Sequence, residues 1–183
     1  MARITAKGSA QYLRNLEKLG RNTDDICKQA VYQGAKVVAD AIKSSIDDIT
    51  VHSLPPGQKY FYLSEEDKKR GMLLDGVTKE QADGLKNGLG IAVMEHKNFA
   101  WNTKIGFNGY NEVRTKTYPK GQPNILIASS VENGADLARA VESGTSLRNK
   151  TPFIAPAVKK IRKDAEHAME VTIEEKIHAL IDE

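Results

Sequence analysis

The sequence predicts an α+β fold, in which a small antiparallel β-sheet packs against a long helix in the N-terminal half and a helix at the C-terminus. Apolar residues recur every three or four positions in 24–49 and again in 156–181, which is helical spacing. Between them, residues 89–107 contain two short stretches with strand-like patterning around a turn, which is typical of a β-hairpin. An inserted pair of short helices is expected ahead of this hairpin.

The chain of 183 residues fits one domain, with residues 51–87 as a helical insertion or loop region and residues 152–183 as the C-terminal helix. Its composition, 40% hydrophobic and 28% charged, is that of a globular protein. No apolar run approaches the ~18 residues that a membrane span needs. The first ten residues have no apolar core for a secretion signal, so we expect an intracellular product. Cys27, the single cysteine, is expected to be a small buried residue.

Two helices are expected in the first quarter of the chain, after a stretch at 2–7 that is compatible with a short edge strand. Ser9 is a candidate N-cap of the first helix, and Gly20 is a candidate stop. Thr23 is a candidate cap of the second helix, which would extend to Ile49 over about 39 Å at 1.5 Å per residue.

This second helix has a thin apolar stripe, because Gly34 and several alanines lie on it. Small side chains let another backbone approach closely, and the sheet and a neighbouring subunit are both candidates for that backbone. Packing in the core is the favoured interpretation.

The segment after the long helix contains Pro55, Pro56 and Gly57, and then three adjacent aromatic residues. Because alternate side chains of an extended chain point in opposite directions, at least one of the three is expected to be exposed. These candidate partner contacts are Tyr60, Phe61 and Tyr62. Capping patterns then predict short helices near 65–74 and 79–87.

The hairpin is expected to pair 89–95 with 99–107 around a turn at 96–98. Residues 111–122 follow as a long basic loop or flexible hairpin, whose candidate partner contacts are Arg114, Lys116 and Lys120. We expect a short helix at 125–132, and the stretch 137–141 is compatible with a strand.

The stretch from Val141 to Val158 is the joint around which the rest of the chain is expected to be arranged. It contains a chain reversal at a glycine, a basic loop, and an apolar segment that offers one large buried anchor just before the last helix. We interpret its residues as determinants of the fold or of an interface: Glu142, Gly144, Thr145, Pro152, Phe153 and Pro156.

The last helix should run from about Pro156 to Ile181. Its first half is basic, with the candidate partner contacts Lys159, Lys160 and Lys163, and its second half is acidic. Residues 1–21 are also basic, so the chain carries opposed charge blocks that are suited to docking on charged protein surfaces. Solvated helix faces are the plainer interpretation.

The sequence does not indicate chemistry. The four histidines lack metal-ligand spacing, the glycines at 84–90 do not form a phosphate-binding loop, and no nucleophile motif is present. We therefore expect no enzyme activity, no cofactor and no metal, with a hydrolase or nuclease as a remote alternative. A small nucleic-acid-binding module is the stronger alternative, if the basic segments meet on one surface near Trp101 or Tyr60.

The motif E-x-G-T-S, followed by a polar loop and P-F-x-x-P-A, resembles the tail-completion or head-to-tail joining family of long-tailed bacteriophages, whose members are minor tail components. The segments KIGFNGYN (104–111) and YPKGQPN (118–124) are similar to the branch of that family in phages of Gram-positive hosts. One departure is a near-duplication of the V-E-x-G element between 127 and 142, which leaves the register of that stretch open.

The resemblance implies a structural virion protein of the neck, made in the host cytoplasm, and it implies neither catalysis nor a cofactor. Its expected partners are the connector or stopper, the tail terminator or the tail tube. The copies would form a homo-oligomeric ring, around DNA that passes without sequence-specific binding, and a monomer when free is compatible with this. The loops at 51–63 and 111–122 are candidates for ordering on docking.

Overall fold

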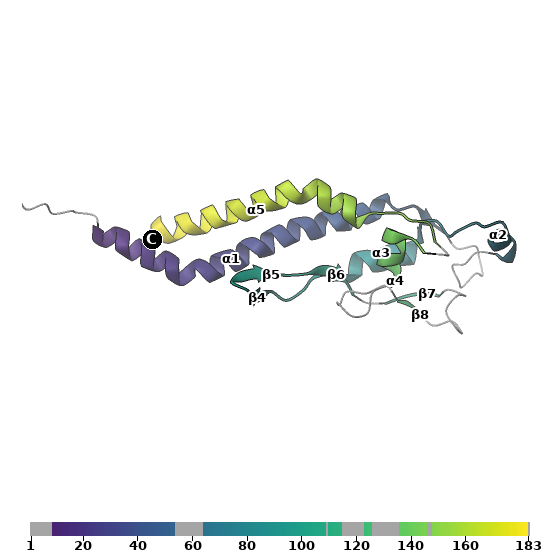
Figure 1. Cartoon of the computed structure of the whole chain (residues 1–183), viewed down its shortest axis with the longest axis horizontal. Helices are drawn as coiled ribbons and strands as arrows, with labels where there is room; N and C mark the ends of the chain where they lie inside the picture. Colours follow the sequence, from purple (N-terminus) through teal and green to yellow (C-terminus); the bar gives the residue numbers. More distant parts are fainter. Residues whose placement is uncertain are drawn as a thin grey trace, which may run out of the picture.

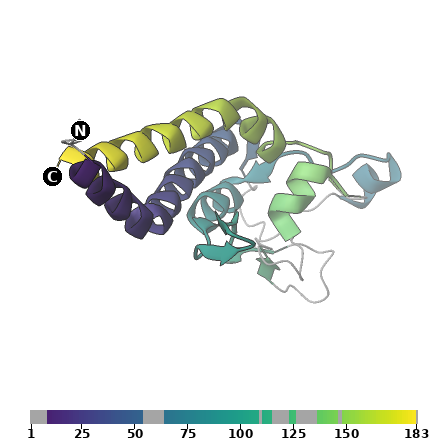
Figure 2. The same ribbon diagram turned by 60° about the vertical axis from the view of Figure 1, so that its left-hand side comes forward.

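The computed structural model describes residues 9–53, 64–108, 110–114, 123–125, 136–145 and 148–182. Its largest elements are two helices, α1 (Ser9–Ser45) and α5 (Ile154–Asp182), which lie side by side along the long axis of the molecule (Figure 1). Short helices and two-stranded sheets lie beside one part of this helical pair (Figures 1 and 2). The α+β class is therefore confirmed. The two long helices pack mainly on each other, a contact that the sequence did not predict, and α1 also contacts strands of the hairpin.

α1 is one continuous helix where two were expected, so the predicted stop at Gly20 is wrong. The side chain of Asn22 donates to the Lys18 carbonyl (2.8 Å) and that of Thr23 donates to the Leu19 carbonyl (2.7 Å). Both side chains therefore bond back into the preceding turn, and Thr23 does not cap a new helix. Glycine and such back-bonding are common where helices bend, and α1 is bent in its N-terminal part (Figure 2).

The 3₁₀ turn η1 (Ile46–Asp48) continues α1, and the predicted end near Ile49 is confirmed. α5 begins two residues earlier than predicted, at Ile154, and Pro156 lies in its first turn, where a missing N–H costs little. Gly34 is a point of close approach between the two helices. A Cβ at Gly34 would lie 2.7 Å from the Met169 side chain and 3.3 Å from the Ala165 carbonyl oxygen, so the approaching backbone is that of α5, which is neither the sheet nor a neighbouring subunit.

The predicted hairpin is confirmed as two antiparallel pairs. β3 (Leu89–Ile91) pairs with β6 (Ile105–Phe107), and β4 (Glu95–Lys97) pairs with β5 (Ala100–Asn102). The turn lies one residue later than expected, because the two residues with positive φ are Asn98 and Phe99.

The described residues contain two further strand pairs. β1 (Val51–His52) lies parallel to β2 (Val77–Thr78), and β7 (Tyr110–Arg114) lies antiparallel to β8 (Pro123–Ile125). The second pair supports the hairpin alternative for 111–122, although residues 115–122 lie outside the described part of the chain. The strand predicted at 2–7 lies outside it as well.

The inserted helical pair consists of α2 (Glu65–Lys69) and α3 (Lys79–Gly88), and α2 is shorter than predicted. A complete capping box begins α3: the Thr78 hydroxyl accepts from the Gln81 N–H (3.2 Å), and the Gln81 side chain accepts from the Thr78 N–H (3.1 Å). Ser64 makes the equivalent bond to the N–H of Asp67 at α2 (3.1 Å).

α4 (Asp136–Ser143) corrects the expectation of a strand at 137–141. Leu137, Ala138 and Val141 are buried, and their spacing of one and four positions puts them on one face of a helix. A helix was predicted at 125–132. Its first residue, Ile125, is instead the last residue of strand β8, and residues 126–132 lie outside the described part of the chain.

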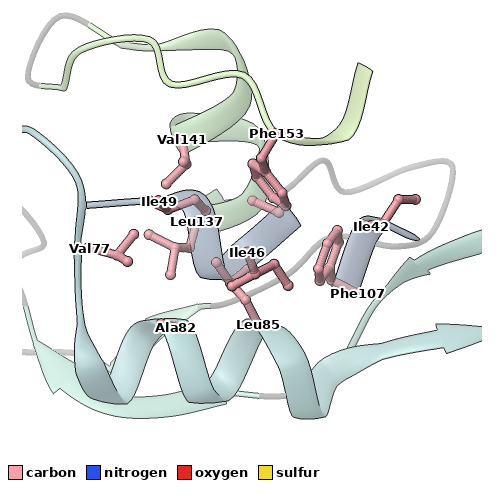
Figure 3. Packing of buried hydrophobic residues seen from close by; sticks show 11 residues of the cluster. Ile42, Ile46, Ile49, Val77, Ala82, Leu85, Phe107, Leu137, Val141 and Phe153 are labelled. Carbon is pink, nitrogen blue, oxygen red and sulfur yellow. The ribbon is translucent and has the colours of Figure 1, made fainter. Parts of the chain in front are cut away.

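The core lies where the end of α1, α3, α4 and the hairpin meet. Figure 3 shows its side chains converging from these elements. Its buried members are Ile42, Ile46, Ile49, Val77, Ala82, Leu85, Phe107, Leu137, Ala138, Val141 and Phe153. The chain thus has a packed end and a long helical arm.

Candidate functional site

The candidate site is the joint between α4 and α5, which comprises Glu142, Gly144, Thr145 and residues 148–153. Gly144 has φ of 74°, and its N–H donates to the Ala140 carbonyl (3.0 Å), which closes the last turn of α4. A Cβ at Gly144 would lie 3.1 Å from the backbone nitrogen of Lys150. Glycine is required here for two reasons, its left-handed backbone and the close passage of the returning chain.

Backbone hydrogen bonds hold the loop after Gly144 on two sides. Thr145 and Arg148 exchange backbone bonds of 2.9 and 3.3 Å, and the Thr151 N–H donates to the Val141 carbonyl (2.8 Å). The Asn149 N–H donates to the carbonyl of Leu74 (2.8 Å), which lies far away in the sequence. The joint is therefore fixed to the helical insertion as well as to α4.

The carboxylate of Glu142 lies at the N-terminus of α5. One oxygen accepts from the N–H groups of Phe153 (2.7 Å) and Ile154 (2.8 Å), and the other accepts from the N–H of Ala155 (3.0 Å). These donors have no partner within the helix, and the positive end of the helix dipole favours a carboxylate. A residue of α4 thus caps α5 and fixes the angle between the two helices.

Phe153 is the buried anchor that the sequence predicted. Its side chain is 4% exposed and meets Phe107 edge to face, with ring centroids 6.0 Å apart (Figure 3). Pro152, just before it, is exposed. The joint, the hairpin and the end of α1 therefore share one core.

Arg148 is a buried residue that the sequence analysis treated only as part of a basic loop. It is 6% exposed, and its guanidinium donates to the Gly76 carbonyl. Burial lowers the pKa of Arg148 to about 10, with Asp75 acting in the opposite direction, so the side chain stays charged at neutral pH. Its role is a second link between the joint and the insertion.

The chain matches the family described as "Bacteriophage HK97-gp10, putative tail-component", over residues 10–144. That range covers about three quarters of the 183 residues. The chain belongs to this family of phage tail components. It is a structural family and not an enzyme family. No curated protein and no solved structure matches the chain.

In this tail component, the family match spans α1 to α4 and ends at Gly144, within the joint. The described residues contain no group of three or more His, Cys, Asp or Glu side chains that could hold a metal ion. No helix in the described part of the tail component is long and apolar enough to cross a membrane.

The structure describes only some of the predicted partner contacts. Lys159, Lys160 and Lys163 are exposed on α5. Arg114 ends β7, and its side chain lies outside the described part of the tail component. The remaining predicted contacts, Tyr60, Phe61, Tyr62, Lys116 and Lys120, also lie outside it, as does most of the two loops expected to order on docking.

The basic segments at 14–21 and 159–163 lie at opposite ends of the helical pair. Lys18 donates to the carbonyl of Leu180 (3.3 Å), so the basic start of α1 lies beside the acidic end of α5. The basic charges of α1 and the acidic charges of α5 therefore complement each other within one subunit of the tail component. This arrangement does not favour the continuous basic surface that the nucleic-acid alternative requires.

Phe99 is a candidate contact that the sequence analysis missed. It lies at the tip of the β4–β5 hairpin, fully exposed and with φ of 62°. The signal in the sequence is Asn98, which tolerates a left-handed turn, followed by a bulky residue where glycine is usual. The strand expected at 99–107 would include Phe99, and within a strand this signal has no meaning.

Proposed function

We propose that this protein is a structural subunit of the phage neck, which completes the tail and joins it to the DNA-filled head. The match of residues 10–144 to the tail-component family carries the proposal. The motif from Glu142 to Ala157, which continues beyond that match, resembles the tail-completion branch and supports the narrower role.

The shape of the subunit suits a part that bridges neighbours. The packed end holds the core, and the α1–α5 arm extends away from it (Figure 1). Tyr12, Leu13 and Leu16 are exposed near the free end of the arm. Several copies would form a ring around the DNA passage, and a ring requires two different surfaces of each subunit to meet.

The partners in this proposal are the connector or stopper on the head side, and the tail terminator or tail tube on the tail side. The exposed Lys159, Lys160 and Lys163 offer a positive surface to one of them. DNA passes through the ring without sequence-specific contacts.

The proposal is tested by removing the gene product from the phage. We expect DNA-filled heads and separate, full-length tails, which join when the purified protein is added back. Normal joining without the protein would contradict the proposal. Absence of assembled tails would also contradict it, because it would place the protein at an earlier step of tail assembly.

A further inference from the structure

The tip of the β4–β5 hairpin has a geometry that folding alone does not explain. Asn98 and Phe99, with φ of 52° and 62°, occupy the turn between Lys97 and Ala100. A two-residue turn with both φ values positive is best filled by Asn-Gly. Asn98 fits this rule, whereas the bulky side chain of Phe99 strains the backbone.

The strain is not offset by burial, because Phe99 is fully exposed. The hairpin is anchored on α1, since the Lys28 ammonium of that helix lies 5.4 Å from the Trp101 centroid. Within the hairpin, the rings of Trp101 and His96 lie 5.0 Å apart. An aromatic side chain on an anchored hairpin, exposed at a strained position, is the usual form of a contact residue.

A cavity that fits this side chain lies where α1 ends and α5 begins. Its volume is about 440 Å³, and its apolar lining comes from Ile49, Phe153, Pro156, Ala157 and Ile161. A cavity of roughly 150 Å³ is enough to hold benzene, so this one has room for a phenyl ring together with the turn that carries it.

We propose that Phe99 of one copy inserts into this cavity of the next copy, and that this contact repeats around the ring. The proposal rests on the ring of the proposed function. Charge favours a second copy as the occupant. The tip is bordered by one acid and one base, Glu95 and Lys97, which pair with each other (2.5 Å), and the cavity is also bordered by one acid and one base, Asp48 and Lys160. The two surfaces therefore meet without an excess of charge of one sign.

The tip and the cavity belong to different parts of the subunit, as the contacts of a ring require. The β4–β5 hairpin lies beside α1 (Figure 1), whereas the residues that line the cavity come from the end of α1 and the start of α5, so each copy can donate its tip to one neighbour and accept the tip of another. A reciprocal pair of copies is the alternative that the cross-linking below separates from a ring. The apolar groove between α1 and α5 is a less suitable acceptor. Trp101 and Asn102 of the same hairpin line it, so insertion there would place two hairpins against each other and close a dimer.

Disulfide trapping tests the contact in the full-length protein. With Cys27 replaced by serine, the variant carries Phe99→Cys in the tip and Ala157→Cys in the cavity. On oxidation, we expect a ladder of cross-linked multimers that ends at one closed size. Each single variant lacks one partner, so neither should give a ladder.

The matched control is Val93→Cys with Ala157→Cys, because Val93 is exposed on the same hairpin but away from its tip. A ladder no stronger than that of this control would overturn the proposal, and so would a product that stops at the dimer. Phe99→Gly offers a second variant that relieves the strain of the turn, so it should fold. It should reduce the number of joined particles by about tenfold or more, as loss of a buried aromatic anchor does.

The outcomes separate this contact from the proposed function. A protein that gives the ladder but is not needed for joining would contradict the neck role and leave the contact standing. A protein needed for joining that gives no ladder would contradict the contact alone.

Discussion

At the residue scale, Phe153 and Glu142 stabilise the same joint by different interactions. Phe153 packs an apolar ring against Phe107, while Glu142 supplies a charge to three N–H groups at the start of α5. The first effect is the removal of apolar surface from water, and the second is the capping of a helix. Each can be removed without the other.

Phe153→Ala should lower the free energy of unfolding by about 3–5 kcal/mol, because it leaves a cavity in the shared core. Chemical denaturation measures this. Phe99→Ala is the matched control, since it removes the same ring from an exposed position and should leave stability nearly unchanged. Equal effects of the two substitutions would contradict the role of Phe153 as anchor.

Glu142→Gln keeps the shape of the side chain but removes its charge and one acceptor oxygen. We expect a loss of about 1–2 kcal/mol in the free energy of unfolding. Glu166→Gln is the control, because Glu166 forms an exposed pair with Arg162 on α5 (2.9 Å), and its loss should stay within about 0.5 kcal/mol. A Glu142 variant as stable as the control would show that the cap contributes nothing.

The two residues differ in how far the sequence predicts them. Phe153 was predicted as a buried anchor, because it is a large apolar side chain just before the helical pattern of the last helix. The capping role of Glu142 was not predicted, since the donors lie 11 to 13 positions later in the chain. Only the fold brings them together.

At the scale of elements, the sequence predicted a helix correctly where its capping residues lie close to each other in the chain. The capping box of Thr78 and Gln81 is such a case, and α3 begins where it predicts. The prediction of a helix end at Gly20 was wrong because a glycine followed by polar residues, here Asn22 and Thr23, is also typical of a helix end. Packing against α5 instead favours one long helix, since tertiary contacts outweigh local propensity.

The continuity of α1 can be tested at Gly20, where a Cβ would meet nothing within 4 Å. Gly20→Ala should raise the free energy of unfolding by about 0.5–1 kcal/mol, because glycine is unfavourable inside a helix. Gly144→Ala should lower it by about 1–2 kcal/mol, because φ there is 74°. If both substitutions destabilise the protein to the same degree, Gly20 ends a helix after all.

At the scale of the whole molecule, the antiparallel packing of α1 and α5 changes the interpretation of the charge blocks. The basic start of α1 lies beside the acidic end of α5, so these two blocks complement each other within one subunit. The sequence could not show this, because it does not reveal which helices are neighbours. The basic first half of α5 remains the block available to a partner.

Replacing Lys159, Lys160 and Lys163 together by glutamate should leave the folded subunit intact, because all three are exposed. It should nevertheless prevent the joining of heads and tails, measured by adding the variant to separated heads and tails. Lys36→Glu with Lys43→Glu, at exposed positions of α1, is the matched control and should join normally. Unimpaired joining by the triple variant would exclude this surface as a partner contact.

A three-dimensional reconstruction of the joined particle decides whether this tail component is a shaped subunit of the head-to-tail junction, as we propose. We expect a closed ring at the junction in which each copy shows the long α1–α5 arm. Placement of these arms along the tail shaft or at its distal tip, with none at the junction, would contradict the proposal.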